Sequence, residues 1–159
     1  MFLEQLFAFL LIVQFIVVLL HDWLDIPGWT HGSQVQKIIG KRKLLIATFI
    51  NAIFPGAAVA LAIIFWGRSK PEFATDYWVI YCAVTIGSAI LMWYVPYLAG
   101  TTERKRAVYA SMYAGTRQVL PDRNGNPRPN LMHVCLHALF AINLALAVAV
   151  RMSGGLLRA

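Results

Sequence analysis

Long apolar runs alternate with short polar segments along this chain. Four such runs cover about residues 2–24, 44–66, 77–98 and 131–152. A helix of about 22 residues, with a rise of 1.5 Å per residue, is long enough to cross the hydrocarbon core of a bilayer. Aromatic residues gather near the ends of the runs, as in the interfacial belts of membrane helices: Trp23, Trp66, Tyr77, Trp78, Trp93 and Tyr97. The pattern predicts an all-α fold, a four-helix transmembrane bundle that forms one integral membrane domain over residues 1–159.

Prolines mark where these helices are expected to end or bend. Pro27 disfavours helical geometry at Ile26, so the first helix is expected to end near Asp25. Pro55 and Pro96 lie inside the second and third runs. Each removes one backbone donor from its helix and is expected to kink it.

The segment between the third and fourth runs is long for a connection in a helical bundle. Within residues 102–114, Val108 and Met112 are one helical turn apart and lie opposite the charged residues of the first turn. That arrangement predicts an amphipathic helix lying in the membrane interface. Asn124 and Gly125 then predict a tight turn.

Composition agrees with a chain that is solvated mostly by lipid. Hydrophobic residues make up 59% of the sequence, charged residues 13%, and the mean hydropathy is +0.63. The net charge of +7 is carried by the loops, where orientation and contacts with anionic lipid head groups explain it. Nucleic acid is not an expected partner, because no basic surface interleaved with aromatic residues lies outside the apolar runs.

The distribution of Lys and Arg predicts the orientation. The first and third loops share one face and hold ten basic residues: Lys37, Lys41, Arg42, Lys43, Arg104, Lys105, Arg106, Arg117, Arg123 and Arg128. The other face holds four: Arg68, Lys70, Arg151 and Arg158. The positive-inside rule places loops 1 and 3 in the cytoplasm and both termini on the non-cytoplasmic side.

Ionisable groups near the predicted cytoplasmic face are the candidates for chemistry. His133 and His137 are one turn apart on the fourth run, and His21 and Asp25 are one turn apart at the end of the first. The first and fourth helices of a bundle are commonly neighbours, so these four residues are expected to form a polar pocket. Asn130 lies close to the same stripe of the fourth helix.

This pocket has three interpretations at the sequence level. The histidines and Asp25 are candidate catalytic residues for proton transfer. His133 and His137 are also candidate ligands of zinc or iron. Alternatively, the cluster is structural and its members satisfy one another across helices. Tyr97, Arg104, Arg106 and Asn130 are the candidate substrate-binding residues, with an arginine near an anionic head group.

The sequence supports hypotheses from three functional classes. The first hypothesis is a membrane-embedded enzyme or binding protein for a lipid-like or amphipathic small molecule. The second is a non-catalytic accessory subunit of a larger membrane complex or a homo-oligomer, with Gly56, Ala57 and Ala60 docking another helix. A transporter or channel protomer is the third. Membrane lipids are the expected partners in each case.

Overall fold

The computed structural model describes residues 2–156, and it is 74% helical. Its elements are, in chain order, α1 (Phe2–Leu20), β1 (Asp25–Ile26), β2 (Thr30–His31), α2 (Gly32–Ile39), α3 (Lys41–Ile64), α4 (Glu72–Ala89), the π-helix η1 (Ile90–Tyr94), α5 (Val95–Ala99), α6 (Glu103–Met112) and α7 (Leu131–Leu156). Four helical stretches within this part of the chain are long and apolar enough to cross a membrane: Phe2–Leu20, Lys41–Ile64, Glu72–Ala99 and Leu131–Ser153. The four helices predicted from the apolar runs are therefore present.

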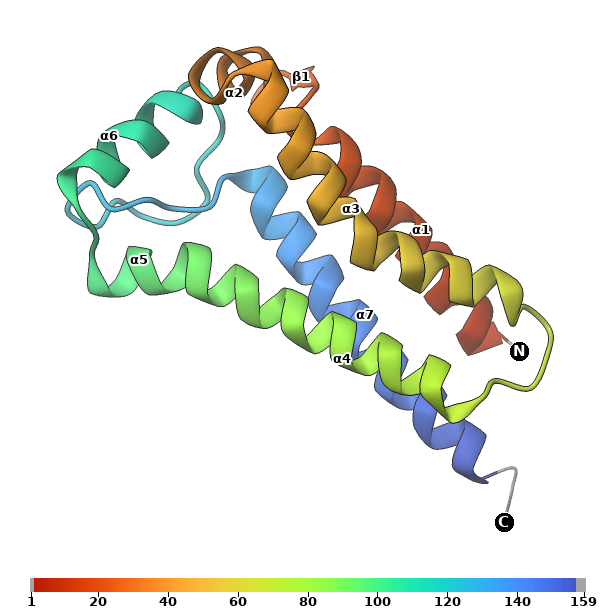
Figure 1. Ribbon diagram of the computed structural model, residues 1–159. Coiled ribbons are helices and arrows are strands. Elements are labelled where there is room, and N and C mark those ends of the chain that lie inside the picture. Colours follow the sequence, from red (N-terminus) through yellow and green to blue (C-terminus); the bar gives the residue numbers. More distant parts are fainter. Residues whose placement is uncertain (1, 157–159) are drawn as a thin grey trace.

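The four long stretches pack side by side (Figure 1). α7 contacts both α4 and α1, α1 also contacts α3, and α3 contacts α4. The predicted neighbourhood of the first and fourth long helices is thus confirmed. Figure 1 shows the short helices α2 and α6 at one end of the molecule, whereas α1 begins and α7 ends at the other.

The centre of the molecule is built around one large aromatic side chain. Trp78 of α4 is 1% exposed and meets the ring of Phe7 of α1 edge to face, with centroids 5.3 Å apart. Its indole N–H donates to the carbonyl oxygen of Ala58 in α3 over 3.0 Å. Ala58 and Ala147 are fully buried, and such small side chains let neighbouring helices approach closely.

A chain of polar side chains crosses the same core. Asn143 of α7 donates to Oε1 of Gln14 in α1 over 2.6 Å, and Gln14 donates to the hydroxyl of Tyr81 in α4. Asn143 is fully buried and Gln14 is 1% exposed. Because unpaired polar groups are costly away from water, these bonds fix the relative rotation of three helices.

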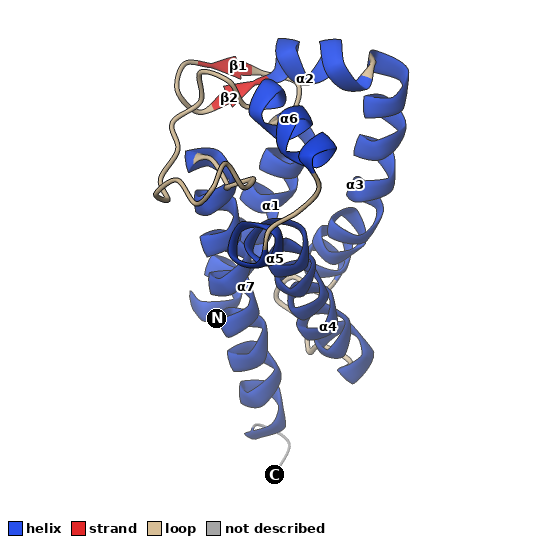
Figure 2. Cartoon of the chain, turned by 90° about the vertical axis from the view of Figure 1, so that its left-hand side faces the viewer, coloured by secondary structure: helices blue, strands red, loops and turns tan. Residues whose placement is uncertain are grey.

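The end of the first helix differs from the prediction. α1 ends at Leu20, not near residue 24 or 25, and Asp25 lies in β1, which pairs with β2 through Asp25–His31 and Ile26–Thr30 (Figure 2). Pro27 and Gly28 form the turn between these strands, and Gly28 has the positive φ of 74° that the turn needs. The fold is therefore not purely helical, because this turn returns the chain along itself and pairs two-residue strands.

One helix and one tight turn of the third loop lie where the sequence pattern predicts them. α6 lies within the range predicted as amphipathic, and the hydroxyl of Thr102 caps it by accepting the backbone N–H of Lys105 over 3.3 Å. The predicted tight turn is present, with φ of 55° at Asn124 and 66° at Gly125.

Pro96 changes the helix before it instead of only bending it. Proline has no N–H, so the carbonyl of Met92 has no α-helical partner four residues later. The helix widens over η1, where the N–H of Val95 bonds to the carbonyl of Ile90, five residues back. Such π-turns are rare and concentrate at functional sites.

Candidate functional site

Three histidines meet at the end of the molecule that carries α2 and α6. His21 follows the last turn of α1, and His133 and His137 lie in the first two turns of α7. The ring centroids of His21 and His133 are 5.5 Å apart, and those of His133 and His137 are 6.1 Å apart. The structure therefore brings together three of the four predicted catalytic residues.

Aromatic rings from η1 and α6 enclose these histidines. The centroid of Trp93 lies 4.2 Å from that of His133, and Tyr113, just past α6, lies 5.2 Å from it. Tyr94 approaches the other histidine, with its hydroxyl 3.2 Å from Nδ1 of His137. We call His21, His133, His137, Trp93, Tyr94, Tyr109 and Tyr113 the histidine–aromatic cluster.

The π-turn explains how two successive aromatic residues reach two histidines. Successive residues of an α-helix point about 100° apart, whereas the wider turn of a π-helix reduces that angle. Trp93 and Tyr94, both in η1, thus face the same neighbouring helix. Their partners, His133 and His137, are separated by one turn of α7.

Asn130 fixes the ring of His133. Its Oδ1 accepts the backbone N–H of His133 over 3.0 Å and lies 2.7 Å from ring Nδ1. Its Nδ2 donates to the carbonyl of Trp29, so the amide orientation is determined and the ring nitrogen must be the donor. Nε2 of His133 has no hydrogen-bond partner among the described residues, which leaves its lone pair available in the neutral ring. Asn130 is thus a positioning residue.

The carboxylate beside the cluster is Asp22. Its Oδ2 lies 3.3 Å from Nε2 of His21, whose Nδ1 is 3.1 Å from the carbonyls of Val17 and Val18. Both ring nitrogens of His21 therefore face acceptor oxygens.

Asp25 does not join the cluster, contrary to the prediction. Its Oδ1 accepts the backbone N–H and the hydroxyl of Ser33 over 3.0 and 3.1 Å. These bonds lower the pKa of the exposed Asp25 carboxyl. A helix continuing through residue 25 would place Asp25 on the stripe that carries His21, but the turn at Pro27 removes it from that stripe.

The other predicted binding residues separate into two groups. Asn130 and Arg106 lie at the site, and Arg106 lines a cleft of about 310 Å³ between α6 and the loop that follows it. Arg104 is exposed on α6 and does not line the cleft. Tyr97 is buried, and its hydroxyl donates to the carbonyl of Pro121 over 3.2 Å, so it anchors the third loop.

The cleft adjoins the histidine–aromatic cluster. Tyr109 and Tyr113 belong to both, since they line the cleft and their rings contact each other and Trp93. Burial raises the pKa of both tyrosines, and the carboxylate of Asp22 raises that of Tyr113 further.

The donor set does not fit zinc or iron. Among residues 2–156, no group of three or more His, Cys, Asp or Glu side chains is close enough to hold a metal ion. Nδ1 of His133 is occupied by Asn130, and a zinc site takes at least three protein ligands.

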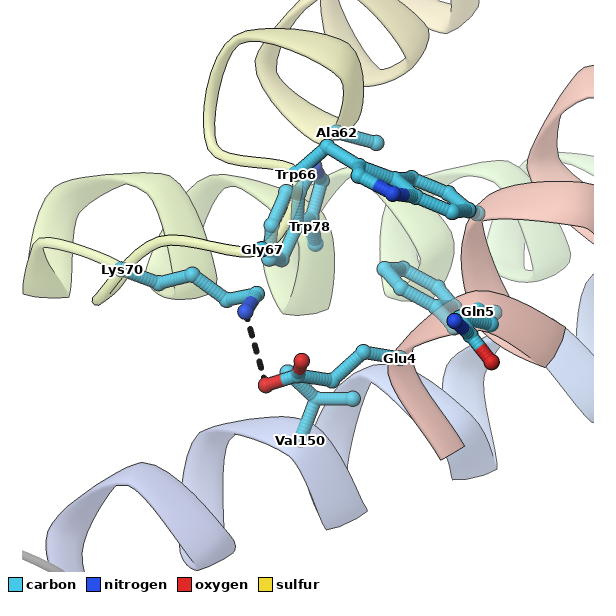
Figure 3. Close-up of a pocket in the computed structure, with 10 residues that line it drawn as sticks. Glu4, Gln5, Ala62, Trp66, Gly67, Lys70, Trp78 and Val150 are labelled. Carbon is cyan, nitrogen blue, oxygen red and sulfur yellow. Dashed lines mark ion pairs between the residues drawn. The ribbon is translucent and has the colours of Figure 1, made fainter. Parts of the chain in front are cut away.

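A second, smaller cavity lies at the opposite end of the molecule (Figure 3). It encloses about 80 Å³, and its charged groups, Glu4 and Lys70, form an ion pair of 2.7 Å. Its remaining lining is mostly apolar, including Trp66, Trp78 and Val150. Its charged groups are satisfied by each other, so the larger cleft is the better candidate.

Several residues of the site were not identified from sequence. Trp93 and Tyr113 were assigned to the aromatic belt and the amphipathic helix, and Gln118 and Asn126 of the cleft gave no sequence signal. The proline three residues after Trp93 is the one signal that indicated an irregular helix there.

The chain matches no protein-family model, no curated protein and no solved structure.

Proposed function

We propose that this chain is a multi-pass integral membrane protein that binds, and acts on, a lipid-like or amphipathic small molecule at the end carrying α2 and α6. The observation that carries the proposal is the junction of the cleft with the histidine–aromatic cluster through Tyr109 and Tyr113. The cleft holds the polar head of the ligand, and the cluster supplies groups that exchange protons.

Membrane insertion is supported by the outer surfaces of the long helices. Large apolar side chains of α3 are exposed, among them Phe49, Ile53 and Phe54, at 69%, 62% and 63%. Such a surface is costly in water and ordinary in lipid. In the proposed orientation, loops 1 and 3 are cytoplasmic, both termini are non-cytoplasmic, and α6 lies in the membrane interface.

Within the site, His133 is the proposed proton acceptor. Its Nδ1 proton is held by Asn130, so Nε2 carries the lone pair, and a general base needs such a fixed tautomer. His21 lies beside His133 with Asp22, and His137 with Tyr94 extends the polar floor. Arg106 lines the cleft and is the proposed partner of an anionic group of the ligand.

Photo-crosslinking tests the proposal. The purified protein in lipid nanodiscs is irradiated with a phospholipid analogue that carries a diazirine near its head group, and the modified peptides are mapped. We expect labelling to concentrate on α6 and the first turns of α7, and to be reduced by excess unlabelled lipid. Labelling spread evenly over the exposed face of α3, with none at α6, contradicts the proposal.

The accessory-subunit alternative has less support. Gly56, one of the residues expected to dock another helix, already faces the ring of Phe15 in α1, where an added Cβ would lie 3.6 Å from it. Ala57 and Ala60 remain exposed. The small-residue stripe is therefore partly used within the chain, whereas the cleft is open.

A further inference from the structure

Unpartnered polar atoms concentrate in the cleft beneath α6. Four buried side-chain polar atoms of the described residues lack a hydrogen-bond partner, and three belong to residues that line this cleft: Arg106 Nε, Gln118 Oε1 and Asn126 Oδ1. Buried polar groups in folded proteins are almost always paired. Three exceptions around one cleft indicate a ligand that supplies the missing partners.

The orientations of both amides follow from their other bonds. Nδ2 of Asn126 donates to the carbonyl of Tyr97 over 3.1 Å, and Nε2 of Gln118 donates to the hydroxyl of Thr116 over 3.2 Å. The free atom of each is therefore the carbonyl oxygen, which accepts hydrogen bonds. Asn126 is only 7% exposed, so water reaches its side chain poorly.

The cleft thus offers both positively charged hydrogen-bond donors and hydrogen-bond acceptors. The guanidinium of Arg106 and that of Arg128 supply positive charge and donors, although Arg128 also donates to the carbonyl of Leu120 over 2.9 Å. Gln118, Asn126 and the exposed carboxylate of Asp122 supply acceptors. A matching ligand carries an anion and, a few atoms away, a cation with several N–H donors.

We infer that the cleft binds a phosphoethanolamine group, with the phosphate at the arginines and the primary ammonium at the three acceptors. This inference rests on the proposed function and names its ligand class. Arg forms charge-assisted hydrogen bonds with phosphate oxygens, and an ammonium group has three donors. A cleft of about 310 Å³ is at the lower end of the range for small-molecule sites, which suits a head group whose acyl chains stay in the bilayer.

The choline head group provides a matched probe. It has the same phosphate and the same positive charge, but its nitrogen is fully methylated and donates no hydrogen bond. The inference therefore requires that phosphatidylethanolamine bind better than phosphatidylcholine with the same acyl chains. Leaving the two buried acceptors, Gln118 Oε1 and Asn126 Oδ1, unpaired is expected to weaken binding about tenfold or more.

Native mass spectrometry of the full chain in detergent measures this preference. We expect phosphatidylethanolamine to bind at least about tenfold more tightly than phosphatidylcholine or phosphatidylglycerol. Arg106→Gln is expected to remove most of that binding, whereas Arg104→Gln, on the same helix but outside the cleft, leaves it unchanged. Soluble O-phosphoethanolamine distinguishes the two sources of this group. Competition at concentrations similar to those of the lipid identifies a soluble ligand, competition only at much higher concentrations identifies the lipid, and no competition overturns the inference.

A second variant guards against misfolding of the first. Asp122 is exposed, so Asp122→Asn is expected to fold normally and to reduce the preference for ethanolamine over choline several-fold. Equal binding of the two lipids, or phosphatidylethanolamine binding that Arg106→Gln does not weaken, overturns the inference. If the two lipids bind equally but the photo-crosslinker still labels α6, the inference fails and the proposed function stands. If no lipid binds and α6 is not labelled, the inference and the proposed function both fail.

Discussion

Asn130 holds His133 at two points, since its Oδ1 accepts the backbone N–H over 3.0 Å and lies 2.7 Å from ring Nδ1. The first bond caps α7 at its N-terminus, and the second selects the ring tautomer. One side chain therefore couples the start of a helix to the protonation geometry of the proposed base.

The two roles of Asn130 are separable by substitution. Asn130→Ala removes both and is expected to lower the free energy of unfolding by about 1 kcal/mol through loss of the cap. Asn130→Ser keeps a capping oxygen but is too short to hold the ring. We expect Asn130→Ser to restore most of the stability but not the single tautomer. Unfolding by SDS titration measures the stability, and the ¹⁵N chemical shifts of the His133 ring report the tautomer. A single Nδ1–H tautomer in both variants contradicts the assignment.

The buried polar chain in the core predicts coupled stabilities. Asn143→Leu and Gln14→Leu each remove their shared bond, which in membrane proteins contributes on average about 0.6 kcal/mol and at most about 1.7 kcal/mol. The double variant is expected to lose less than the sum of the two single losses. Unfolding by SDS titration measures all three. Asn51→Leu, at an exposed position of α3, is the control and is expected to leave stability unchanged.

Close backbone packing at Gly32 predicts opposite effects for the same substitution at two glycines. A Cβ at Gly32 would clash with the backbone carbon of Trp23, so Gly32→Ala is expected to lose about 1–3 kcal/mol of stability. A Cβ at Gly87 in α4 meets nothing within 4 Å, and Gly87→Ala is expected to gain up to about 1 kcal/mol. Thermal unfolding in one detergent compares the two. Equal effects mean that the first loop is not packed as described.

Tyr113 predicts a loss of stability at alkaline pH. Burial, and secondarily Asp22, raises its pKa in the folded protein, while Tyr109 and His133 are its other titratable neighbours. The neutral ring therefore stabilises the fold fully below about pH 10, the pKa of an unfolded tyrosine, and this contribution is lost as pH rises toward the folded pKa. Tyr113→Phe is expected to reduce the loss, measured by unfolding at several alkaline pH values. An unchanged pH dependence contradicts the burial of this hydroxyl.

The proposed orientation predicts which loops react from outside the cell. Ser69 lies between α3 and α4 and Arg123 in the third loop, and both are exposed. Ser69→Cys is expected to react with a membrane-impermeant maleimide in intact cells, and Arg123→Cys only after lysis. The native Cys82 and Cys135 lie in apolar helices, and the parent protein measures their background. The reverse pattern means that loops 1 and 3 are outside.

Much of the fold could be predicted from the sequence because four long apolar runs give a simple pattern. Each predicted run overlaps a long helix, and the loop pattern identified α6 to within a few residues. Histidine spacing together with helix adjacency also brought His21, His133 and His137 together correctly.

The remaining part of the site depends on irregular backbone that periodicity does not encode. Asp25 was misplaced because the turn at Pro27 begins a pairing of strands only two residues long. Trp93 points into the site because of a π-turn, and Asn126 gains its place from a fold of the third loop against Tyr97. Each depends on contacts between segments far apart in the sequence.

The continuous helical stretch Glu72–Ala99 has a further consequence, which concerns bilayer thickness. Its 28 residues extend about 42 Å at a rise of 1.5 Å each, against a hydrocarbon core of about 30 Å. In the proposed membrane setting, the excess length is accommodated by tilting the helix or by raising one of its ends into the head-group layer. Trp93 and Tyr97 lie near the C-terminal end of this stretch, so the depth of the cleft relative to the lipid phosphates is expected to change with bilayer thickness. Bilayer thickness is then a second variable, besides the head group, that acts on the proposed site.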